Sequence, residues 1–165
     1  MNIKIREIDI SDIDFILDIE NNKDIWKVSH TKAAYTRNEI ELFITKNIIE
    51  GLSNGQKRWI ITYKNQACGC IDLFDNNDIN RRAGIGIVIH NDFQSKGIAT
   101  KALKKFIKFC SKDLKLHQLY CSIIPDNTIS IQLFTKLGFE KTGIRKNWTL
   151  YENNWYDEYF YQLEL

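Results

Sequence analysis

The sequence has a single proline, Pro125, and no stretch rich in proline, glycine or serine. Linkers between domains usually have such a composition, so nothing in the chain marks a domain boundary. A chain of 165 residues with 44% hydrophobic residues has the size of one ordinary domain, and it can bury a core without disulfides or structural metal. We therefore predict that residues 1–165 form one domain.

An excess of one sign of charge is also missing. The 23 lysine and arginine residues nearly balance the 21 aspartate and glutamate residues, which leaves a net charge of +2 at pH 7. Overall charge therefore gives no reason to expect binding to nucleic acid or to an anionic membrane. Any anion site must be local, and we expect neither nucleic acid nor a membrane among the partners.

Long apolar runs are absent as well. No segment approaches the roughly 20 apolar residues that span a bilayer. The start of the chain, MNIKIREIDISDIDF, has charges throughout and no apolar run of secretory length. We expect a soluble, cytoplasmic protein.

Cysteines are few, and each lies in an apolar segment: Cys68, Cys70, Cys110 and Cys121. Cys68 and Cys70 would share one face of a strand, and their spacing is too short for the usual zinc knuckle. A metal or redox role is the less favoured alternative. We interpret all four as reduced core residues, and we predict no metal site.

Two helices are predicted near the N-terminus, after a strand at 3–8. Ser11 is the expected N-cap of the first, whose apolar residues recur at helical spacing. Thr36 and Glu39 have the spacing of a capping box at the start of the second, which should run for about 12 to 16 residues. Its expected core positions are Ile40, Phe43, Ile44 and Ile48.

The middle of the chain predicts an antiparallel meander at 58–63, 67–74 and 83–89, followed by a long helix at about 97–112 and a strand at 118–124. Because the helix connects the strands at 83–89 and 118–124, these two should be parallel neighbours. The outer side of the helix has a row of lysines, Lys101, Lys104, Lys105 and Lys108, which is typical of a solvated face rather than a binding surface.

The C-terminal part predicts a helix that ends at Gly138, then strands at 139–144 and 156–163. The whole order, β-α-α-β-β-β-α-β-α-β-β, predicts an α/β (α+β) fold. Its sheet should be mixed and mostly antiparallel, with about seven strands and helices on both faces.

The bend between the strand at 83–89 and the following helix is a candidate phosphate site, because the first N–H groups of a helix lack partners and its dipole attracts anions. No P-loop string occurs. A dinucleotide fingerprint begun by Gly84 and Gly86 fails, because Ile89 stands where its third glycine should be. What remains is Gln94-Ser95-Lys96-Gly97-Ile98-Ala99, a Q-x-x-G-x-A string.

This string resembles the acetyl-CoA signature of the GNAT superfamily of N-acetyltransferases, [Q/R]-x-x-G-x-[G/A], which lies in the same strand-bend-helix context. Within this superfamily, the chain is most similar to the branch of spermidine acetyltransferases and ribosomal-protein N-terminal acetyltransferases. The segments that carry this likeness are NRRAGIGIVIHNDFQSKGIATKAL, which contains the string, the downstream NTISIQLFTKLGF and the aromatic end WYDEYFYQLEL. The likeness extends over essentially the whole chain. It implies that acetyl-CoA donates an acetyl group to a primary amine by direct attack in a ternary complex.

The resemblance also implies where acetyl-CoA binds. Gly97 lacks a Cβ, so the backbone can approach a diphosphate, and the pantetheine arm would pair with the backbone of Ile87 and Ile89 once the parallel strands splay apart. A strand N–H near Val88 would polarise the thioester carbonyl. Asn127 would contact the arm, cap its own helix, or both. The residues assigned to the cofactor are Ile87, Val88, Ile89, Gln94, Ser95, Lys96, Gly97, Ile98, Ala99, Thr100 and Asn127.

Two residues are predicted to act on the reacting groups. Asp72 is the candidate to bind or deprotonate the amine, directly or through water, and an exposed strand carboxylate is the equally weighted alternative. Ser130 matches a serine of the ribosomal-type enzymes and is expected to contact the thiol. Many relatives have a tyrosine where this chain has Phe134, which has no proton to donate. Further unranked carboxylates near the expected groove are Glu20, Asp24 and Glu41.

The acceptor stays open between a small molecule, such as a polyamine or amino compound, and the N-terminus of a peptide or protein. Spermidine acetyltransferases have a glutamate where this chain has Gly84, so part of an acidic patch is missing. His30 is a possible contributor, while His90 and His117 are interpreted as incidental. The aromatic residues expected to wall the groove, or else to lie in the core or an interface, are Trp26, Tyr35, Trp148 and Trp155.

Two other functional classes remain open. A non-catalytic acyl-CoA-binding module is the first, motivated by Phe134 and by the uncertain base. A dimerising interaction domain that uses the aromatic tail is the second. A homo-oligomer, a dimer or larger, is possible in each case.

Overall fold

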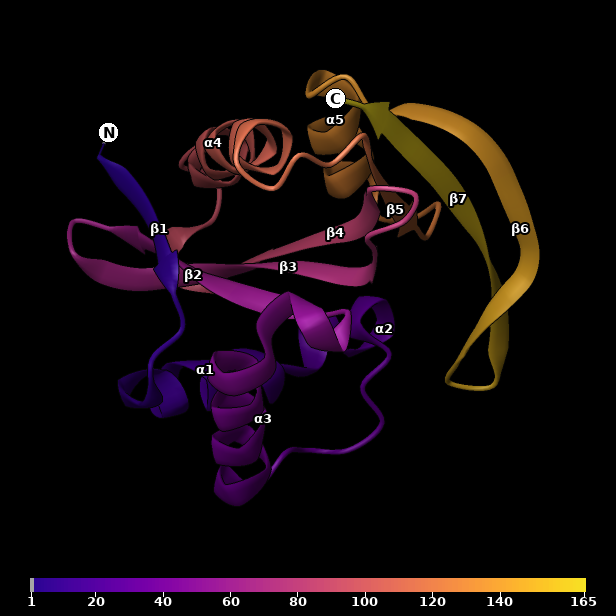
Figure 1. The fold of residues 1–165 in the computed structure, drawn as a ribbon. Helices are drawn as coiled ribbons and strands as arrows, with labels where there is room; N and C mark the ends of the chain where they lie inside the picture. Colours follow the sequence, from indigo (N-terminus) through magenta and orange to yellow (C-terminus); the bar gives the residue numbers. More distant parts are fainter. Residues whose placement is uncertain (1) are drawn as a thin grey trace.

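The computed structural model describes residues 2–165, which contain one sheet with helices on both faces (Figure 1). The described strands follow the order β1-β2-β3-β4-β5-β7-β6, and β4 and β5 are its parallel pair. The strands are β1 (Ile3–Glu7), β2 (Lys57–Tyr63), β3 (Gln66–Asn77), β4 (Arg82–Ile89), β5 (Gln118–Ile123), β6 (Glu140–Tyr151) and β7 (Asn154–Glu164). The predicted mixed, mostly antiparallel seven-stranded sheet with one parallel pair is confirmed.

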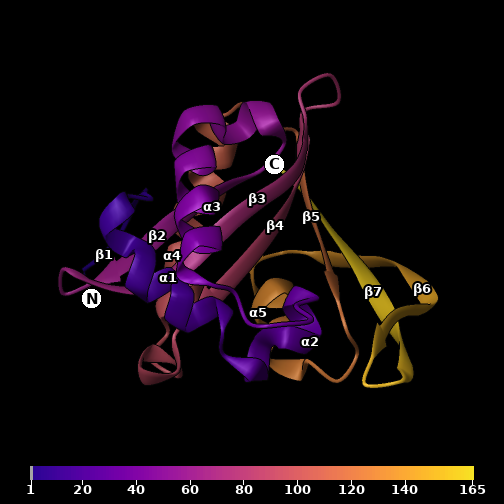
Figure 2. The same ribbon diagram turned by 90° about the horizontal axis from the view of Figure 1, so that it is seen from below.

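Figures 1 and 2 show α1, α2 and α3 on one face of the sheet and α4 and α5 on the other. The helices are α1 (Ile13–Glu20), α2 (Trp26–Ser29), α3 (Arg37–Glu50), α4 (Ile98–Lys112) and α5 (Thr128–Lys136). Short 3-10 turns occur at Ile10–Asp12, Lys23–Ile25, Gly51–Asn54 and Asn91–Phe93. The sequence did not predict α2, whose four residues are too few to show a helical period. No helix within residues 2–165 combines the length and hydrophobicity that a membrane crossing requires.

Each face of the sheet has its own core. Trp59 and Ile61 of β2 pack in the cluster that also holds Leu103 and Phe106 of α4. Ile60, between them, packs in the other cluster with α1 and α3. Side chains alternate across a strand, and a fully buried aliphatic or aromatic side chain contributes about 1.5–3 kcal/mol. The sheet is therefore held from both sides.

Cys68 and Cys70 do not share a face, contrary to the prediction. The pairs Ile61↔Gly69 and Thr62↔Ala67 leave Cys68 as the extra residue of a β-bulge. The bulge changes the alternation, so Cys68 packs in the α4 cluster and Cys70 in the α1/α3 cluster. All four cysteines are buried and none forms a disulfide, so their predicted place in the core is confirmed.

One predicted helix cap was wrong and the other is confirmed. Asp9, not Ser11, caps the turn that leads into α1: its side chain accepts from the Ser11 N–H at 2.9 Å, and its own N–H donates to Asp12 at 2.8 Å. The extra 3-10 turn before α1 moves the cap toward the N-terminus. At α3 the Thr36 N–H donates to Glu39 Oε2 at 2.7 Å, and the Glu39 N–H donates to Thr36 Oγ1 at 3.3 Å. These two bonds form the expected capping box.

In α3, Asn47 takes the buried place that the sequence assigned to Ile48, which is 55% exposed. The Asn47 side chain accepts from the backbone N–H of Arg58 at 2.7 Å and donates to its carbonyl at 3.4 Å. A polar side chain fits this core position because the backbone of β2 satisfies it. The pairing fixes the start of β2 against α3, and it fixes the position of Arg58.

The parallel strands β4 and β5 stay together for a short distance. Along the described strands they pair at Arg82↔Gln118, Ala83↔Leu119 and Gly84↔Tyr120, and beyond Gly84 the pairing ends. From there β4 keeps its other neighbour, β3, up to Ile89, while β5 stays with β7. Figure 2 shows the two strands diverging along this stretch. The predicted splay is therefore present, and it opens a gap at Ile85–Ile89.

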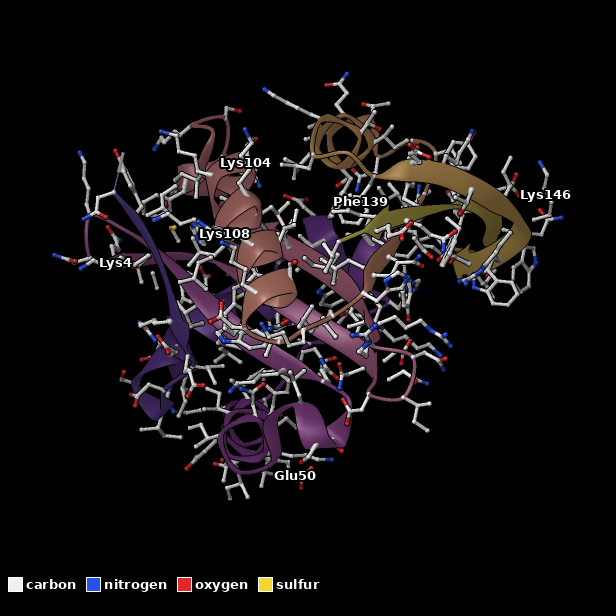
Figure 3. The ribbon with its side chains drawn as sticks, turned by 45° about the horizontal axis from the view of Figure 1, so that its top comes forward. Lys4, Glu50, Lys104, Lys108, Phe139 and Lys146 are labelled. Carbon is white, nitrogen blue, oxygen red and sulfur yellow. The ribbon has the colours of Figure 1, made fainter. Side chains whose placement is uncertain are left out.

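The C-terminal hairpin is longer than predicted. β6 and β7 run from Glu140 to Glu164 around a turn at Glu152 and Asn153, both with positive φ. Their pairing shifts register between Arg145 and Thr149 and then resumes, which carries the strands past the predicted ends. In Figure 3, Lys146 lies on the outer edge of this hairpin, and Lys104 and Lys108 point away from α4. The lysine row of α4 is exposed, as predicted.

Candidate active site

The bend before α4 is a main-chain anion cradle. Ser95 and Gly97 have φ of 60° and 72°, and the first helical bond of α4 runs from Lys101 N–H to the Gly97 carbonyl at 3.3 Å. Among the described residues, the N–H groups of residues 95–100 have no hydrogen-bond acceptor. A Cβ built at Gly97 meets no described atom within 4 Å, so the space above the bend is open. The geometry fits a diphosphate held by backbone amides.

The side chains of the bend brace it from inside. Gln94 donates to the Ile89 carbonyl and to Asn91 Oδ1, both at 3.0 Å. Lys96 donates to the Asp92 carbonyl at 2.6 Å, and its ammonium lies 5.3 Å from the ring centre of Phe93. Gln94 thus holds the loop to the end of β4, and Lys96 holds it to the 3-10 turn at Asn91–Phe93, while the N–H groups of the bend stay free.

The ladder with β3 shows which backbone groups of β4 face the gap. His90 N–H donates to the Cys68 carbonyl at 2.9 Å, and opposed residues of an antiparallel pair alternate between bonded and non-bonded positions. Val88 therefore bonds to β3, whereas Ile87 and Ile89 direct their backbone groups into the gap. The strand N–H that was predicted near Val88 to polarise the carbonyl would then be that of Ile87 or Ile89, because the N–H of Val88 itself is bonded to β3.

On the α1/α3 side of the sheet, the gap opens into a cleft of about 1350 Å³. Six acidic and four arginine or lysine side chains line it, so it is suited to a cation. The predicted site residues that line it are Glu20, Trp26, His30, Tyr35, Asp72, Ile87, Val88, Asn127, Ser130, Phe134 and Trp148. The candidates Asp24, Glu41 and Trp155 lie outside it, as do His90 and His117, which fits the incidental interpretation of the two histidines.

One wall of the cleft holds a buried ion cluster around Arg58. Arg58 faces Asp72 directly across the β2–β3 ladder and donates to both its oxygens, each at 2.7 Å. Its third contact is Glu20 Oε1 at 2.5 Å. Burial acts to lower the pKa of Arg58, but the carboxylates of Asp72 and Glu20 outweigh it and hold that pKa well above its ordinary value.

This arrangement changes the role of Asp72. Both oxygens of Asp72 accept from the same guanidinium, so a proton placed on Asp72 would have to displace part of this two-pronged contact. The geometry favours Asp72 as part of a fixed negative wall rather than as the group that takes a proton. Sequence reasoning missed Arg58. The signal that could have found it is its spacing of two residues from Ile60, which places both side chains on the same face of the strand.

The opposite wall has a second buried carboxylate, Glu158 of β7, which sequence reasoning also missed. Its Oε1 accepts from Thr149 Oγ1 of β6 at 2.6 Å. His30 Nε2 lies 3.8 Å from Oε1, and an Arg145 nitrogen lies 3.9 Å from Oε2. Glu158 is 5% exposed and lines the cleft.

The start of α5 brings three predicted residues to the cleft. Asn127 is the N-cap, since its side chain accepts from the Ser130 N–H at 3.2 Å. The Ser130 hydroxyl makes no hydrogen bond to another described residue, so it is free to bind a ligand. Phe134 is buried, and its ring packs edge-on against Phe139 at 5.0 Å. In Figure 3, Phe139 lies beneath the helix, toward the sheet.

The ring of Phe74 explains why residue 84 is a glycine. A Cβ at this position would lie 2.1 Å from the ring of Phe74, a contact that no side chain tolerates. The Phe74 ring also packs edge-on against Tyr120 at 6.0 Å. An aromatic ring therefore fills the place beside residue 84, at the apex of the gap.

Within residues 2–165, no cluster of histidine, cysteine, aspartate and glutamate has the arrangement of a metal site. The free amides and the exposed edge of β4 have the geometry to hold a long phosphorylated molecule, and the acidic residues of the cleft beyond them suit a cation. A family profile, the acetyltransferase (GNAT) domain, matches residues 2–140. The chain belongs to the GNAT acetyltransferase family. It is an N-acetyltransferase with acetyl-CoA as donor, which confirms the predicted enzyme class and cosubstrate.

Relatives of both predicted kinds are found. Spermidine N(1)-acetyltransferase of Escherichia coli is 25% identical over 142 residues, 86% of this chain and 75% of that protein. The ribosomal protein uS5-alanine N-acetyltransferase of Escherichia coli is 32% identical over 73 residues, 44% of this chain and 38% of that protein. The structure of spermidine N-acetyltransferase from Vibrio cholerae with CoA and spermine has a TM-score of 0.90 at 21% identity, covering 98% of this chain and 95% of that one.

Proposed function

We propose that the chain acetylates a primary amine by direct attack on acetyl-CoA in a ternary complex. The observation that carries this proposal is the position of the gap between β4 and β5, with free amides at one end and an acidic cleft at the other. The cofactor reaches the gap from the bend, and the amine reaches it from the cleft. The thioester and the amine then meet beside the backbone of β4, where holding them in contact is worth about 7–11 kcal/mol of barrier.

The cofactor is held mainly by backbone. The N–H groups of residues 95–100 bind the diphosphate, and the exposed edge of β4 at Ile87 and Ile89 pairs with the pantetheine arm as an added strand would. An N–H of Ile87 or Ile89 polarises the thioester carbonyl. Asn127 keeps its cap and offers its amide nitrogen to the arm.

The acceptor is a cationic amine. Glu20 and Asp72 contribute two negative charges against the single positive charge of Arg58, which leaves that wall with an excess negative charge. A spermidine-like polyamine and a peptide N-terminus both satisfy this chemistry, and both are substrates named for relatives. Phe74 beside Gly84 removes one carboxylate position, which favours a smaller or less charged amine than a long polyamine.

Ser130 is proposed to hydrogen-bond the thiol of the departing CoA. Its hydroxyl is the polar group that α5 presents to the cleft one turn before Phe134. A thiol with a pKa near 8.5 leaves with little assistance, so a weak donor suffices. Phe134 is also what favours the second candidate, a module that binds acyl-CoA without turnover.

Thiol release from acetyl-CoA separates the two candidates. Purified protein is mixed with acetyl-CoA and with spermidine, spermine or a peptide that begins with alanine, and free thiol is measured at pH 8. Burial raises the pKa of Cys110 and of Cys121 to about 12, so the protein's own thiols contribute little background. Saturable release with one of these amines supports the enzyme. Tight CoA binding without release from any of them supports the module.

The remaining expectations are proposals of the same kind: residues 1–165 act as one domain, in the cytoplasm, as a homo-oligomer. Exposed apolar side chains support an oligomer, namely Leu42 and Ile49 on α3 and Trp148, Leu150 and Trp155 on the C-terminal hairpin. Light scattering during gel filtration measures the mass. A monomer at all concentrations would contradict this part of the proposal.

A further inference from the structure

Glu158 is a buried carboxylate with unused capacity to accept hydrogen bonds. A carboxylate has about four acceptor sites on its two oxygens, and buried ones are normally satisfied. Glu158 accepts one hydrogen bond, from Thr149 at 2.6 Å, and its Oε2 accepts none from the described residues. The two cationic side chains nearest to it stand off, His30 at 3.8 Å and Arg145 at 3.9 Å.

Asp72, on the other wall, has the opposite arrangement. Its two oxygens accept a two-pronged pair of bonds from Arg58, and Glu20 shares the same guanidinium. A proton delivered to Asp72 would have to break a part-buried ion pair that is held by two hydrogen bonds, which is unfavourable. A proton delivered to Glu158 Oε2 breaks no hydrogen bond, because Thr149 can remain bound to Oε1, and it weakens only the longer contacts with His30 at 3.8 Å and with Arg145, its cross-strand partner, at 3.9 Å.

We infer that Glu158 binds the acceptor ammonium and is the general base that removes its proton. The inference rests on the proposed function, since it assigns a role in that reaction. A primary ammonium has a pKa near 10.4, so at pH 7 about one molecule in a thousand is ready to attack. A carboxylate in the cleft can bind the ammonium and accept its proton, and it thereby raises the fraction of bound amine that is neutral and able to attack.

The protons and electrons balance. One proton passes from the ammonium to Glu158, and the freed nitrogen lone pair forms a bond to the thioester carbonyl carbon. The C–S bond then breaks, the sulfur takes its electron pair, and the second proton lost by the nitrogen goes to the thiolate. The products are the amide and CoA thiol. Glu158 returns its proton to solvent before the next cycle.

His30 provides the route to solvent. It follows α2, its side chain is 60% exposed, and its Nε2 faces Glu158. Lys27 fixes α2 in place: its ammonium bonds to Asp126 at 2.5 Å and lies 3.7 Å from the ring centre of Tyr156. Lys27 is thus engaged elsewhere, and the charged groups that face Glu158 are His30 and Arg145. His30 acts through Glu158, so its role is to relay a proton.

Glu158→Gln tests the inference, because the amide keeps an oxygen for the Thr149 hydroxyl while it loses the charge and the basic lone pair. With spermidine as acceptor, kcat/KM should fall by at least roughly 100-fold at pH 7, within the range for loss of a general base. The affinity for CoA, measured by calorimetry, should stay within about twofold because the bend is untouched. Glu164→Gln on the same strand, an exposed position, is the matched control and should match wild type in both measurements.

The pH profile separates a base from a structural residue. In Glu158→Gln the rate should follow the free amine and rise about tenfold per pH unit, whereas wild type should rise less steeply. His30→Gln should lower kcat by about tenfold, and added imidazole should restore part of the rate. A flat loss at every pH would indicate a structural effect and would overturn the inference.

Binding keeps the inference testable if turnover fails. CoA-loaded wild type should bind spermidine or the alanine peptide, and Glu158→Gln should bind the same amine at least about tenfold more weakly. Wild type that releases thiol while Glu158→Gln stays within a few-fold would sink the inference and leave the proposed function intact. Wild type that releases no thiol would remove the proposed function, and the binding comparison would then decide the role of Glu158. Failure of wild type to bind either amine would overturn the inference.

Discussion

The gap between β4 and β5 has two ends that are built in different ways. At the end proposed for the cofactor, the site consists of successive free backbone N–H groups of residues 95–100, and side chains of the same loop brace it. At the end proposed for the acceptor, the site consists of charged side chains from three different strands: Arg58 on β2, Asp72 on β3 and Glu158 on β7. The first site is formed by one continuous segment of the chain, whereas the second depends on the tertiary structure.

The difference bears on how each end responds to change. A backbone site depends on one conformation and tolerates most side chains, so a single residue, Gly97, carries most of its sensitivity. A side-chain site depends on charge balance, so removal of any partner leaves another partner buried and unpaired. Substitutions at each end should therefore fail for different reasons, and the following experiments separate them.

Arg58→Met is expected to give the largest effect. It leaves the part-buried carboxylates of Asp72 and Glu20 side by side without a counter-charge, and the loss of unfolding free energy should approach the cost of breaking a fully buried pair, about 3–5 kcal/mol. Urea unfolding at pH 7, followed by circular dichroism, measures the loss. Arg37→Met is the control, because its pair with Asp14 is exposed and should be worth less than about 1 kcal/mol. Equal losses in the two variants would refute the claim that burial sets the difference.

Gly97→Val should weaken CoA binding by roughly 100-fold, because a few charge-assisted bonds from misplaced amides together amount to about 3 kcal/mol. The φ of 72° is unfavourable for a β-branched residue, and the new side chain occupies open space above the bend. Calorimetry with CoA measures the affinity. Gly55→Val is the matched control, since Gly55 also has positive φ and open space but lies outside the bend. It should lose stability and keep its affinity for CoA.

Gly84→Glu should destabilise the fold by about 1–3 kcal/mol, the usual cost of overpacking, because its Cβ would lie 2.1 Å from the Phe74 ring. Phe74→Ala removes that ring. The double variant should therefore be more stable than the sum of the two single changes predicts. It should also bind spermidine more tightly than Phe74→Ala alone, as calorimetry would show. Strict additivity would mean that the ring and residue 84 do not compete for the same space.

Phe134→Tyr and Ser130→Ala test how much help the thiolate needs. If protonation of the sulfur limits turnover, the added phenol should raise kcat by about three- to tenfold, and loss of the serine should lower it by a similar factor. KM for acetyl-CoA should stay nearly constant in both. Steady-state thiol release measures both constants. No change in kcat for either variant would show that CoA leaves unaided.

Substitutions of Asn127 should give the smallest effect, and two variants separate its role as helix cap from its proposed contact with the cofactor arm. Asn127→Ala loses the cap of α5 and about 1 kcal/mol of stability, whereas Asn127→Ser keeps a capping oxygen and loses a few tenths. Both lose the amide nitrogen that is proposed to reach the cofactor arm. A similar drop in CoA affinity in both supports that contact. A drop confined to Asn127→Ala would assign Asn127 to the cap alone.

The sequence predicted the position of the bend and of the helix start that follows it, because their determinants are close together. The Gln94-Ser95-Lys96-Gly97-Ile98-Ala99 string lies in one bend, and the periodicity of α4 places it at a helix start. The parallel pair followed from the crossover helix, and its splay was implied by the resemblance to the GNAT superfamily. The bulge at Cys68 escaped prediction, because one inserted residue reverses the alternation without changing composition.

The residues of the proposed acceptor end could not be predicted from local sequence patterns. Arg58 begins an apolar strand and Glu158 lies in an aromatic one, and a charged residue in such a place usually reaches solvent. Only the pairing register and the packing of α1, α2 and the C-terminal hairpin place both in a cleft. Asp72 was located correctly, but its pairing with Arg58 depends on a register that no local pattern specifies.

The short run of pairing between β4 and β5 makes the sheet two half-sheets that share a brief seam, β1–β4 on one side and β5–β7 on the other. A cofactor arm that lies in the gap supplies the missing rungs of the ladder, so it would hold the halves together as well as react. At a CoA concentration 100 times Kd, such linkage adds about 2.7 kcal/mol to the unfolding free energy. Melting temperature should then report occupancy, and amide exchange should slow on both sides of the seam when CoA binds.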